Sequence, residues 1–385
     1  MTLPLFPVTS VGSWPRPSWL RTATKRQSAD LVELQEQATL LAIKHQEDAG
    51  VDIVTDGEQR RDNFSSFMAD RLGGMKLMTL AELLDHVEDK AAFEALLNAL
   101  DVPSFAIRTP TVVDKLTVER PIATADAKFL REHTRKPIKV ALPGPYLLSR
   151  STWVKDLSSD AYPTREDLAD DIVRLLHDEI RALVEMGVDV IQLDEPVLTE
   201  LVFTGKAATR TFMCAALAAA AEPEDELKLA VELINRVVEG CTKAAGGATI
   251  GLHICRGNWS SKDEVLLAGP YDKLIPHLER MKVDQYVLEY ATPRAGSIDA
   301  LAGLPEKALL GFGAVDPRTD EVEDPKAVVA RVREVAEKLG PERIWLNPDC
   351  GFATFAERPV NVPKIATEKL RTLVTAAEEL RREFA

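Results

Sequence analysis

The stretch TREDLADDIVRLLHDEIRALVEMGVDVIQLDEP, residues 164–196, decides the fold. Its first part has apolar residues at helical spacing, begins with a Thr-x-x-Asp capping pattern at Thr164 and ends at Gly187, a typical helix C-cap residue. A short run rich in β-branched residues follows and ends in Asp194 and Glu195. The stretch therefore predicts a helix that leads into a buried strand with acidic residues at its carboxyl end.

The same alternation of helix and strand continues along the chain in both directions. Eight strands alternating with helices predict a (β/α)8 barrel, the TIM barrel, in an α/β protein. A doubly wound open sheet is the structural alternative, but no Gly-x-Gly-x-x-Gly follows a strand, so its dinucleotide-binding version has little support. The predicted strands are 8–14, 51–57, 137–144, 188–196, 248–255, 285–291, 309–316 and 343–350.

The length of 385 residues fits one barrel that carries an insertion. We predict a single catalytic domain over residues 1–385. The stretch from about 60 to 136, between strands two and three, is too long for a plain connection. It is expected to form an inserted helical and hairpin excursion at the mouth of the barrel.

The composition narrows the class of protein. The net charge of −14 argues against a nucleic-acid partner and against a membrane-surface partner. No run of about 18 apolar residues predicts a membrane-spanning helix, and the first residues lack the pattern of a signal peptide. The sequence therefore predicts a cytoplasmic protein.

The four cysteines fall into two pairs by their setting. Cys214 and Cys241 lie in small, apolar, helix-like surroundings, which favours core packing. Cys255 and Cys350 lie instead at the ends of predicted strands. In a cytosolic chain of this size none of them is expected to belong to a disulfide framework.

Groups that carry chemistry recur where predicted strands end. In a barrel these positions meet at the carboxyl face, where barrel enzymes build their sites. The sequence therefore predicts an active site from these strand ends, namely Asp56-Gly57-Glu58, Asp194-Glu195, His253-x-Cys255, Glu289, Asp316 and Asp349-Cys350.

Four of these residues are candidate ligands of one zinc ion. His253 and Cys255 are two residues apart, and side chains at that spacing on a strand point to the same face. Together with Glu289 and Cys350 they offer one imidazole, one carboxylate and two thiolates, which suits tetrahedral Zn²⁺. Core packing explains any one of these residues equally well, so the prediction depends on the set.

Several segments of the chain resemble the catalytic half of cobalamin-independent methionine synthase. The Asn-Pro-Asp-Cys-Gly segment is the most specific, followed by the His-x-Cys segment. This resemblance implies that zinc is held by His253, Cys255, Glu289 and Cys350. The segments that carry it are VGSWPRP (11–17), DGEQRRDNF (56–64), LPGPYLLS (142–149), VIQLDEPVLTE (190–200), IGLHICRGNW (250–259), VLEYATPR (287–294) and IWLNPDCGF (344–352).

The resemblance also implies how an amino-acid substrate is held. It assigns the amino group of homocysteine to Glu58 and Asp194, and the substrate carboxylate to the turn Gly12-Ser13. Glu200 matches a further acid near the amino-acid pocket. The implied activity is zinc-dependent transfer of a methyl group to the thiol of homocysteine, or of a similar aminothiol, to make methionine.

The chain departs from the family pattern on the side of the methyl donor. The full-length family enzyme has two similar barrels, whereas this chain has room for one. The family also has Asp-x-His after strand seven, where that His is thought to protonate the leaving folate nitrogen. Here Asp316 is retained but Arg318 replaces the His, and arginine is no proton donor at neutral pH. The donor is therefore predicted to be either a methyltetrahydrofolate or a methyl-corrinoid protein, whose methyl group needs no such proton. Arg318 could instead anchor a carboxylate, phosphate or sulfonate group.

Two other functions are consistent with the same residues. One is a zinc alkyltransferase acting on a different thiol, similar to the epoxyalkane–coenzyme M transferases; that thiol has no amino group for Glu58 and Asp194 to bind. The other is a non-catalytic protein that binds zinc or a small molecule. Structural zinc sites usually draw ligands from nearby Cys-x-x-Cys pairs, whereas these ligands come from three different strands, which favours catalysis.

Overall fold

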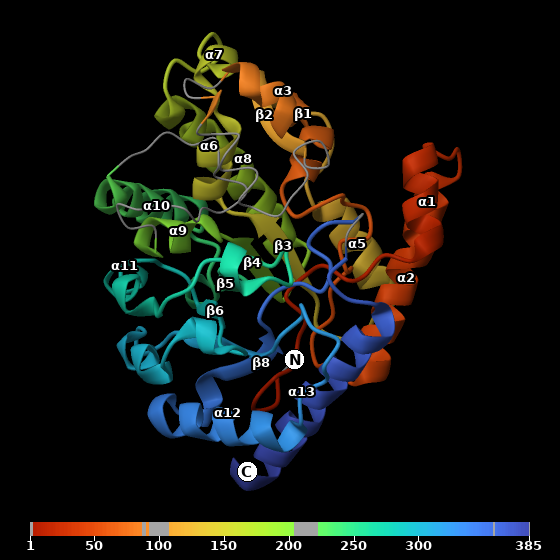
Figure 1. The fold of residues 1–385 in the computed structure, drawn as a ribbon, viewed down its shortest axis with the longest axis vertical. Helices are drawn as coiled ribbons and strands as arrows, with labels where there is room; N and C mark the ends of the chain where they lie inside the picture. The colour runs from red at the N-terminus through yellow and green to blue at the C-terminus, as the bar shows by residue number, and fades with distance from the viewer. Residues whose placement is uncertain (1–2, 87–89, 92–107, 204–221, 357–358, 385) are drawn as a thin grey trace.

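The computed structural model describes residues 3–86, 90–91, 108–203, 222–356 and 359–384. At its centre, six parallel strands pair in chain order, and helices surround them (Figure 1). Most of the strand residues are buried, because helices cover the outer face of the sheet and side chains fill the inner one. The strands are β3 (Lys139–Pro143), β4 (Val190–Asp194), β5 (Thr249–Ile254), β6 (Gln285–Glu289), β7 (Leu309–Val315) and β8 (Ile344–Pro348).

The first two predicted strands form only short pairings between the two edges of this sheet. Isolated parallel bridges join Val8 to Leu346 of β8, Thr9 to Ile53, and Val54 to Ile138 beside β3. The eight extended segments thus follow one another in the order of a (β/α)8 fold. Pairing is brief in the first two segments because each soon leaves the sheet to form a turn. Those turns carry predicted site residues.

Long helices precede the strands, as the sequence predicts. Thr164 and Asp167 form the expected capping box at the start of the helix that leads into β4. Gly50 caps the helix before the second extended segment in a left-handed conformation. The long helices that precede strands are α2 (Leu31–Ala49), α8 (Arg165–Glu185), α10 (Pro223–Val237) and α12 (Pro325–Leu339), and α13 (Pro363–Phe384) follows β8.

The range 60–136 contains an antiparallel hairpin of β1 (Leu72–Thr79) and β2 (Arg108–Val118). The hairpin lies beside α6 and α7 at the top of Figure 1. The hydroxyl of Tyr162 accepts a 2.8 Å hydrogen bond from the backbone of Leu116, and Ser158 donates one of 2.6 Å to the carbonyl of Val112. The remaining helices are α1 (Ser18–Arg26), α3 (Leu80–Leu83), α5 (Thr124–His133), α6 (Pro145–Thr152), α7 (Lys155–Ser158), α9 (Val197–Phe203) and α11 (Ile275–Leu278).

Two smaller predictions have different outcomes. Cys241 is buried in the hydrophobic core, as expected, whereas Cys214 lies outside the described residues. Among the helices in the described ranges, none is both long enough and apolar enough to cross a membrane.

Candidate functional site

A pocket opens where the central strands end at their carboxyl termini. It encloses about 520 Å³ of space, and its wall combines polar groups with aromatic rings. The structure therefore gathers predicted residues that are more than 300 positions apart in the sequence. The predicted site residues that line it are Gly12, Ser13, Glu58, Asp194, His253, Cys255 and Cys350, and the other lining residues are Val11, Phe64, Pro196, Asn258, Trp259, Gly351, Thr354 and Phe355.

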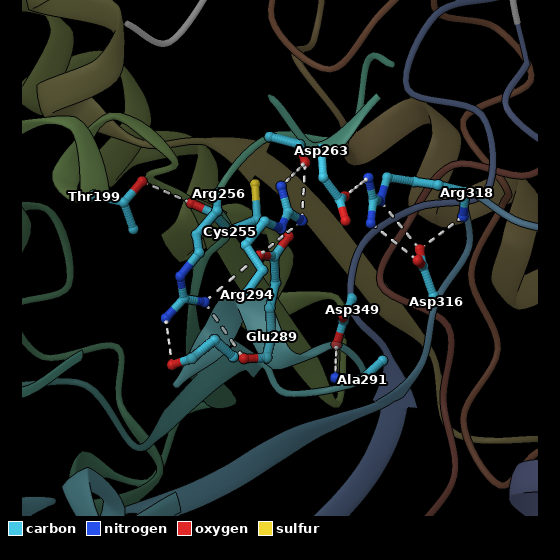
Figure 2. Close-up of polar contacts among 12 residues, drawn as sticks. Thr199, Cys255, Arg256, Asp263, Glu289, Ala291, Arg294, Asp316, Arg318 and Asp349 are labelled. Atoms are coloured by element: carbon cyan, nitrogen blue, oxygen red, sulfur yellow. Dashed lines mark hydrogen bonds and ion pairs between the residues drawn. The ribbon is translucent and has the colours of Figure 1, made fainter. Parts of the chain in front are cut away.

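Three of the predicted metal ligands form a compact buried group. One potential ligand atom from each of His253, Cys255 and Cys350 lies within 4.8 Å of the other two. His253 is on β5, Cys255 directly follows that strand, and Cys350 follows β8. The hydroxyl of Thr199 fixes the backbone here by donating a 2.8 Å hydrogen bond to the carbonyl of Cys255 (Figure 2).

The imidazole of His253 is oriented by an acid from the neighbouring strand. Its Nδ1 lies 2.9 Å from Oδ1 of Asp194, the last residue of β4. A carboxylate oxygen can only accept, so Nδ1 is the donor, and Nε2 is the nitrogen that could bind a metal once its own proton is lost. Gln192 donates a second hydrogen bond, of 2.8 Å, to the same Asp194 oxygen.

The two thiols of the group influence each other. A hydrogen bond from the thiol of Cys350 holds the pKa of Cys255 below its usual range, although burial acts in the opposite direction. Burial would lower the pKa of His253, but the hydrogen bond to Asp194 and the nearby charge of Cys255 raise it to about 9. The group therefore favours a thiolate next to a cation, which is the charge pattern of a metal-binding site.

Glu289, the fourth predicted ligand, lies outside the compact group and is held by two arginines. Its Oε2 is 3.5 Å from Nη1 of Arg256 and 3.4 Å from Nη2 of Arg294. Figure 2 shows the carboxylate of Glu289 next to Arg294, at the end of β6. Arg256 is fully buried and its guanidinium stacks on the ring of Tyr271 at 3.9 Å. Glu289 is thus not part of the compact group that His253, Cys255 and Cys350 form.

Glu58 is directed into the pocket by a strained turn. Gly57 and Glu58 both have positive φ, 66° and 55°, and Glu58 is one of three non-glycine residues with positive φ in the described chain. The turn brings the Glu58 carboxylate so close to Gly12 that a Cβ there would lie 2.3 Å from Oε1. Oε2 is buried without a hydrogen-bond partner, and burial raises the pKa of Glu58 to about 7, against the opposing effect of Arg61.

The turn Gly12-Ser13 is joined to the loop that carries Cys350. The backbone of Phe352 donates a 2.9 Å hydrogen bond to the carbonyl of Ser13, and that of Ala353 donates one of 3.3 Å to its hydroxyl. The side chain of Asn258, from the loop after β5, donates a 2.6 Å hydrogen bond to the carbonyl of Gly351 in the same Cys350 loop. The part of the pocket assigned to a substrate carboxylate is therefore fixed to the part that holds the thiols.

Glu200 does not line the pocket. It lies on α9 and its Oε1 is 3.7 Å from Nη2 of Arg150, which also contacts Glu226 at 3.2 Å. Its predicted role beside an amino-acid substrate thus remains a prediction. The structure places it in a buried ionic network between helices.

Arg318 also lies outside the pocket lining, and two acids contact its guanidinium. Nε and Nη2 contact the two carboxylate oxygens of Asp316 at 3.1 and 3.0 Å, and Nη1 contacts Asp263 at 2.7 Å (Figure 2). The N–H groups of Arg318 that could anchor an anionic ligand are therefore bound by Asp316 and Asp263 of the same chain.

Sequence reasoning overlooked the residues that support the predicted ones. Gln192 is two residues before Asp194 on the same strand, and this spacing was a usable signal that both face inward. Arg256 and Arg294 come from loops, for which periodicity gives no signal. Lys139 lies in the predicted strand PIKVALPG, and a lysine in such an apolar run is an unusual feature that could have drawn attention to it.

The chain is similar to proteins of one enzyme family over nearly its whole length. The family described as "Cobalamin-independent synthase, Catalytic domain" matches residues 6–379. Methionine synthase of Thermococcus kodakarensis is 30% identical over 393 residues, which cover 100% of this chain and 96% of the relative. Methionine synthase of Sulfolobus acidocaldarius is 27% identical and covers 99% and 94%. A B12-independent methionine synthase from Shewanella sp. W3-18-1, solved with selenomethionine, superimposes with a TM-score of 0.75 at 25% identity and 98% coverage of both chains. The chain therefore belongs to the cobalamin-independent methionine synthase family, through its catalytic domain.

Proposed function

We propose that this methyltransferase of the methionine synthase family uses zinc to transfer a methyl group to the thiol of homocysteine, or of a similar aminothiol. The observation that supports this most directly is the group of His253, Cys255 and Cys350 in the same pocket as Glu58 and Asp194. A thiol-activating centre and a cation-binding centre are thereby adjacent. An aminothiol has a thiol for the first centre and an ammonium group for the second.

The residues present fit a zinc ion. Two sulfur ligands and one imidazole match the donors that Zn²⁺ prefers, and a fourth ligand would complete a tetrahedral site. Asp194 orients His253 by accepting a hydrogen bond from Nδ1, the kind of contact that metal-bound histidines usually make with their second nitrogen. Glu289 is the proposed fourth ligand, and its present contacts with Arg256 and Arg294 are long enough to be exchanged. A bound Zn²⁺ would supply the charge that keeps a substrate thiol ionised near neutral pH.

The chain's own residues would hold the amino-acid part of the substrate. Glu58 Oε2 is buried without a partner, and a substrate ammonium would satisfy it. Asp194 would face the same ammonium with the oxygen that does not contact His253. The Gly12-Ser13 turn would receive the carboxylate. A substrate held in this way would direct its thiol toward Cys255 and Cys350, which line the same pocket.

An activity assay with a panel of donors tests the proposal. The zinc-loaded protein is incubated with homocysteine and, in turn, methyltetrahydrofolate, its polyglutamates or methylcobalamin, and methionine formation is measured. We expect methionine with at least one donor, and its loss in Cys350→Ser. Cys241→Ser is the matched control, since Cys241 is also buried but does not line the pocket. Equal activity in both variants would contradict the role of Cys350.

A comparison of thiols separates this proposal from alkyl transfer to a thiol without an amino group. When both are measured at saturating zinc, Glu58→Gln and Asp194→Asn should weaken homocysteine binding and leave the binding of 2-mercaptoethanesulfonate nearly unchanged. Unchanged homocysteine affinity in both variants would rule out the aminothiol assignment. No change at the metal on addition of any thiol would favour a non-catalytic binding protein.

A further inference from the structure

A lysine is buried inside the ring of strands, next to the proposed aminothiol site. Lys139 is the first residue of β3, and only 2% of it is exposed. Its ammonium donates one hydrogen bond, of 3.2 Å, to Oε1 of Gln192. A buried lysine costs free energy through lost hydration unless acids compensate for it. The mechanism proposed above makes no use of this residue.

A continuous chain of hydrogen bonds connects Lys139 to a proposed metal ligand. Because Lys139 occupies the oxygen of the Gln192 side chain, the amide nitrogen is turned toward Asp194 and donates to Oδ1 at 2.8 Å. The same oxygen contacts His253 Nδ1 at 2.9 Å. Residues of three neighbouring strands, β3, β4 and β5, therefore form a single line of polar contacts.

Lys139 is also a buried cation that interacts with both acids of the ammonium site, as Arg61 does. Burial lowers the pKa of Lys139 to about 7, while Asp194 and then Glu58 act in the opposite direction. Two carboxylates that share a small pocket disfavour each other's charged form. An internal cation reduces that repulsion. The charged groups around the Glu58 carboxylate are Arg16, Asp56, Arg61, Lys139 and Asp194.

We propose that Lys139 is a positioning residue of the aminothiol site. It orients Asp194 toward His253 through the amide of Gln192, and its positive charge favours the ionised form of Glu58 for the incoming substrate ammonium. The inference rests on the proposed function, since it presumes a substrate with an ammonium group. It assigns a role to a residue that touches neither the substrate nor the metal.

The test measures methionine binding by titration calorimetry between pH 6 and pH 9 in the full-length, zinc-loaded protein. Methionine retains the ammonium and carboxylate but has no thiol proton to complicate the measurement. In Lys139→Met the Glu58 carboxylate loses a neighbouring cation, so the acid limb, the pH below which binding weakens, should rise by roughly one unit, from about 7, which is about fivefold weaker binding at pH 7. At pH 9 the difference from the wild type should fall below about threefold, because Glu58 is then ionised in both proteins.

A second variant separates orientation from charge. Gln192→Leu breaks the line of hydrogen bonds and leaves the lysine charge in place. It should reduce zinc affinity by about tenfold, as loss of an outer hydrogen-bond partner commonly does, without shifting the acid limb. Lys369→Met is the matched control: Lys369 is also fully buried, but its ammonium contacts Glu321 and Glu323 rather than the line of hydrogen bonds that reaches His253. It should lower the thermal unfolding temperature and leave both binding properties unchanged.

The outcomes separate the two proposals. If Glu58→Gln weakens methionine binding but Lys139→Met leaves the acid limb in place, Lys139 has only a structural role and this inference is wrong. If Glu58→Gln has no effect, the aminothiol assignment itself fails. Should Lys139→Met not fold, Lys139→Gln removes the charge, retains a hydrogen-bond donor and is expected to give the same shift.

Discussion

Asp194 contacts His253 at 2.9 Å, so one acid both lines the substrate pocket and orients a proposed metal ligand. Asp194→Asn should therefore reduce zinc affinity by about 10- to 100-fold, because an amide holds the imidazole tautomer less firmly than a carboxylate. Competition with a chromogenic chelator measures this affinity directly.

Glu58→Gln is the control for that measurement. Glu58 lines the same pocket, but no hydrogen bond joins it to His253 among the described residues. Its loss should affect substrate binding and leave zinc affinity unchanged. Equal losses of zinc affinity in the two variants would mean that the charge of the pocket, rather than the contact to His253, controls the metal.

Glu58 should also make the protein less stable as the pH rises. Burial raises its pKa from 4.5 to about 7 in the folded protein, so between these values the folded state keeps a proton that the unfolded state has lost. The unfolded state is then favoured as the pH increases. By pH 8 the cost is of the order of 3 kcal/mol, from 1.36 kcal/mol per unit of pKa.

Urea unfolding of Glu58→Gln at pH 5 and pH 8 measures this effect. The variant should be more stable than the wild type at pH 8, by up to roughly 3 kcal/mol, and the difference should be smaller at pH 5, below the raised pKa. It should bind homocysteine less well than the wild type at pH 8, where the wild-type Glu58 is ionised. A variant that is less stable at pH 8 would show that the Glu58 carboxylate is well solvated or paired in the folded state.

Gly12 should tolerate no side chain while Glu58 is present. A Cβ at this position would lie 2.3 Å from Glu58 Oε1, so Gly12→Ala must displace the carboxylate. Homocysteine binding should weaken by about tenfold or more, given the 1–3 kcal/mol that overpacking commonly costs. A double-mutant cycle with Glu58→Ala identifies the cause. If Gly12→Ala costs as much in the Glu58→Ala background as alone, the clash is not with that carboxylate.

Much of this site could be predicted because strand periodicity and chain order place strand ends on one face. The six strands of the central sheet fall within the predicted ranges, and the capping box at Thr164 is present. Gly12, Ser13, Glu58, Asp194, His253, Cys255 and Cys350 all line one pocket. Parallel strands of similar length leave little freedom in where their last residues lie.

Side-chain partners that come from loops and distant helices could not be predicted in this way. Glu289 is at the end of a predicted strand, yet its contacts with Arg256 and Arg294 depend on the paths of two loops. Glu200 pairs with Arg150, fifty positions earlier, because α6 and α9 approach each other in space. Neither the paths of these loops nor the contact between the two helices leaves a periodic signal in the sequence.

Arg318 and Asp316 form a two-point ion pair, and both side chains are largely buried. Arg318→Ala leaves the Asp316 carboxylate without its main partner and should destabilise the protein by about 3 kcal/mol. Asp316→Ala combined with Arg318→Ala should recover part of that loss, because no charge is then left unpaired.

The pair of Arg333 and Glu383 provides the matched control for this experiment. It has the same two-point geometry, with contacts of 2.7 Å, but both side chains are 39% exposed. Arg333→Ala should therefore cost less than about 1 kcal/mol. Urea unfolding compares the two single variants. If their costs were equal, Asp316 would be solvated well enough to stand alone, and Arg318 would then be free to bind an anionic group of the methyl donor. If Arg318→Ala is by far the more costly, the arginine mainly neutralises Asp316, and the donor-side anion must be sought elsewhere in the pocket.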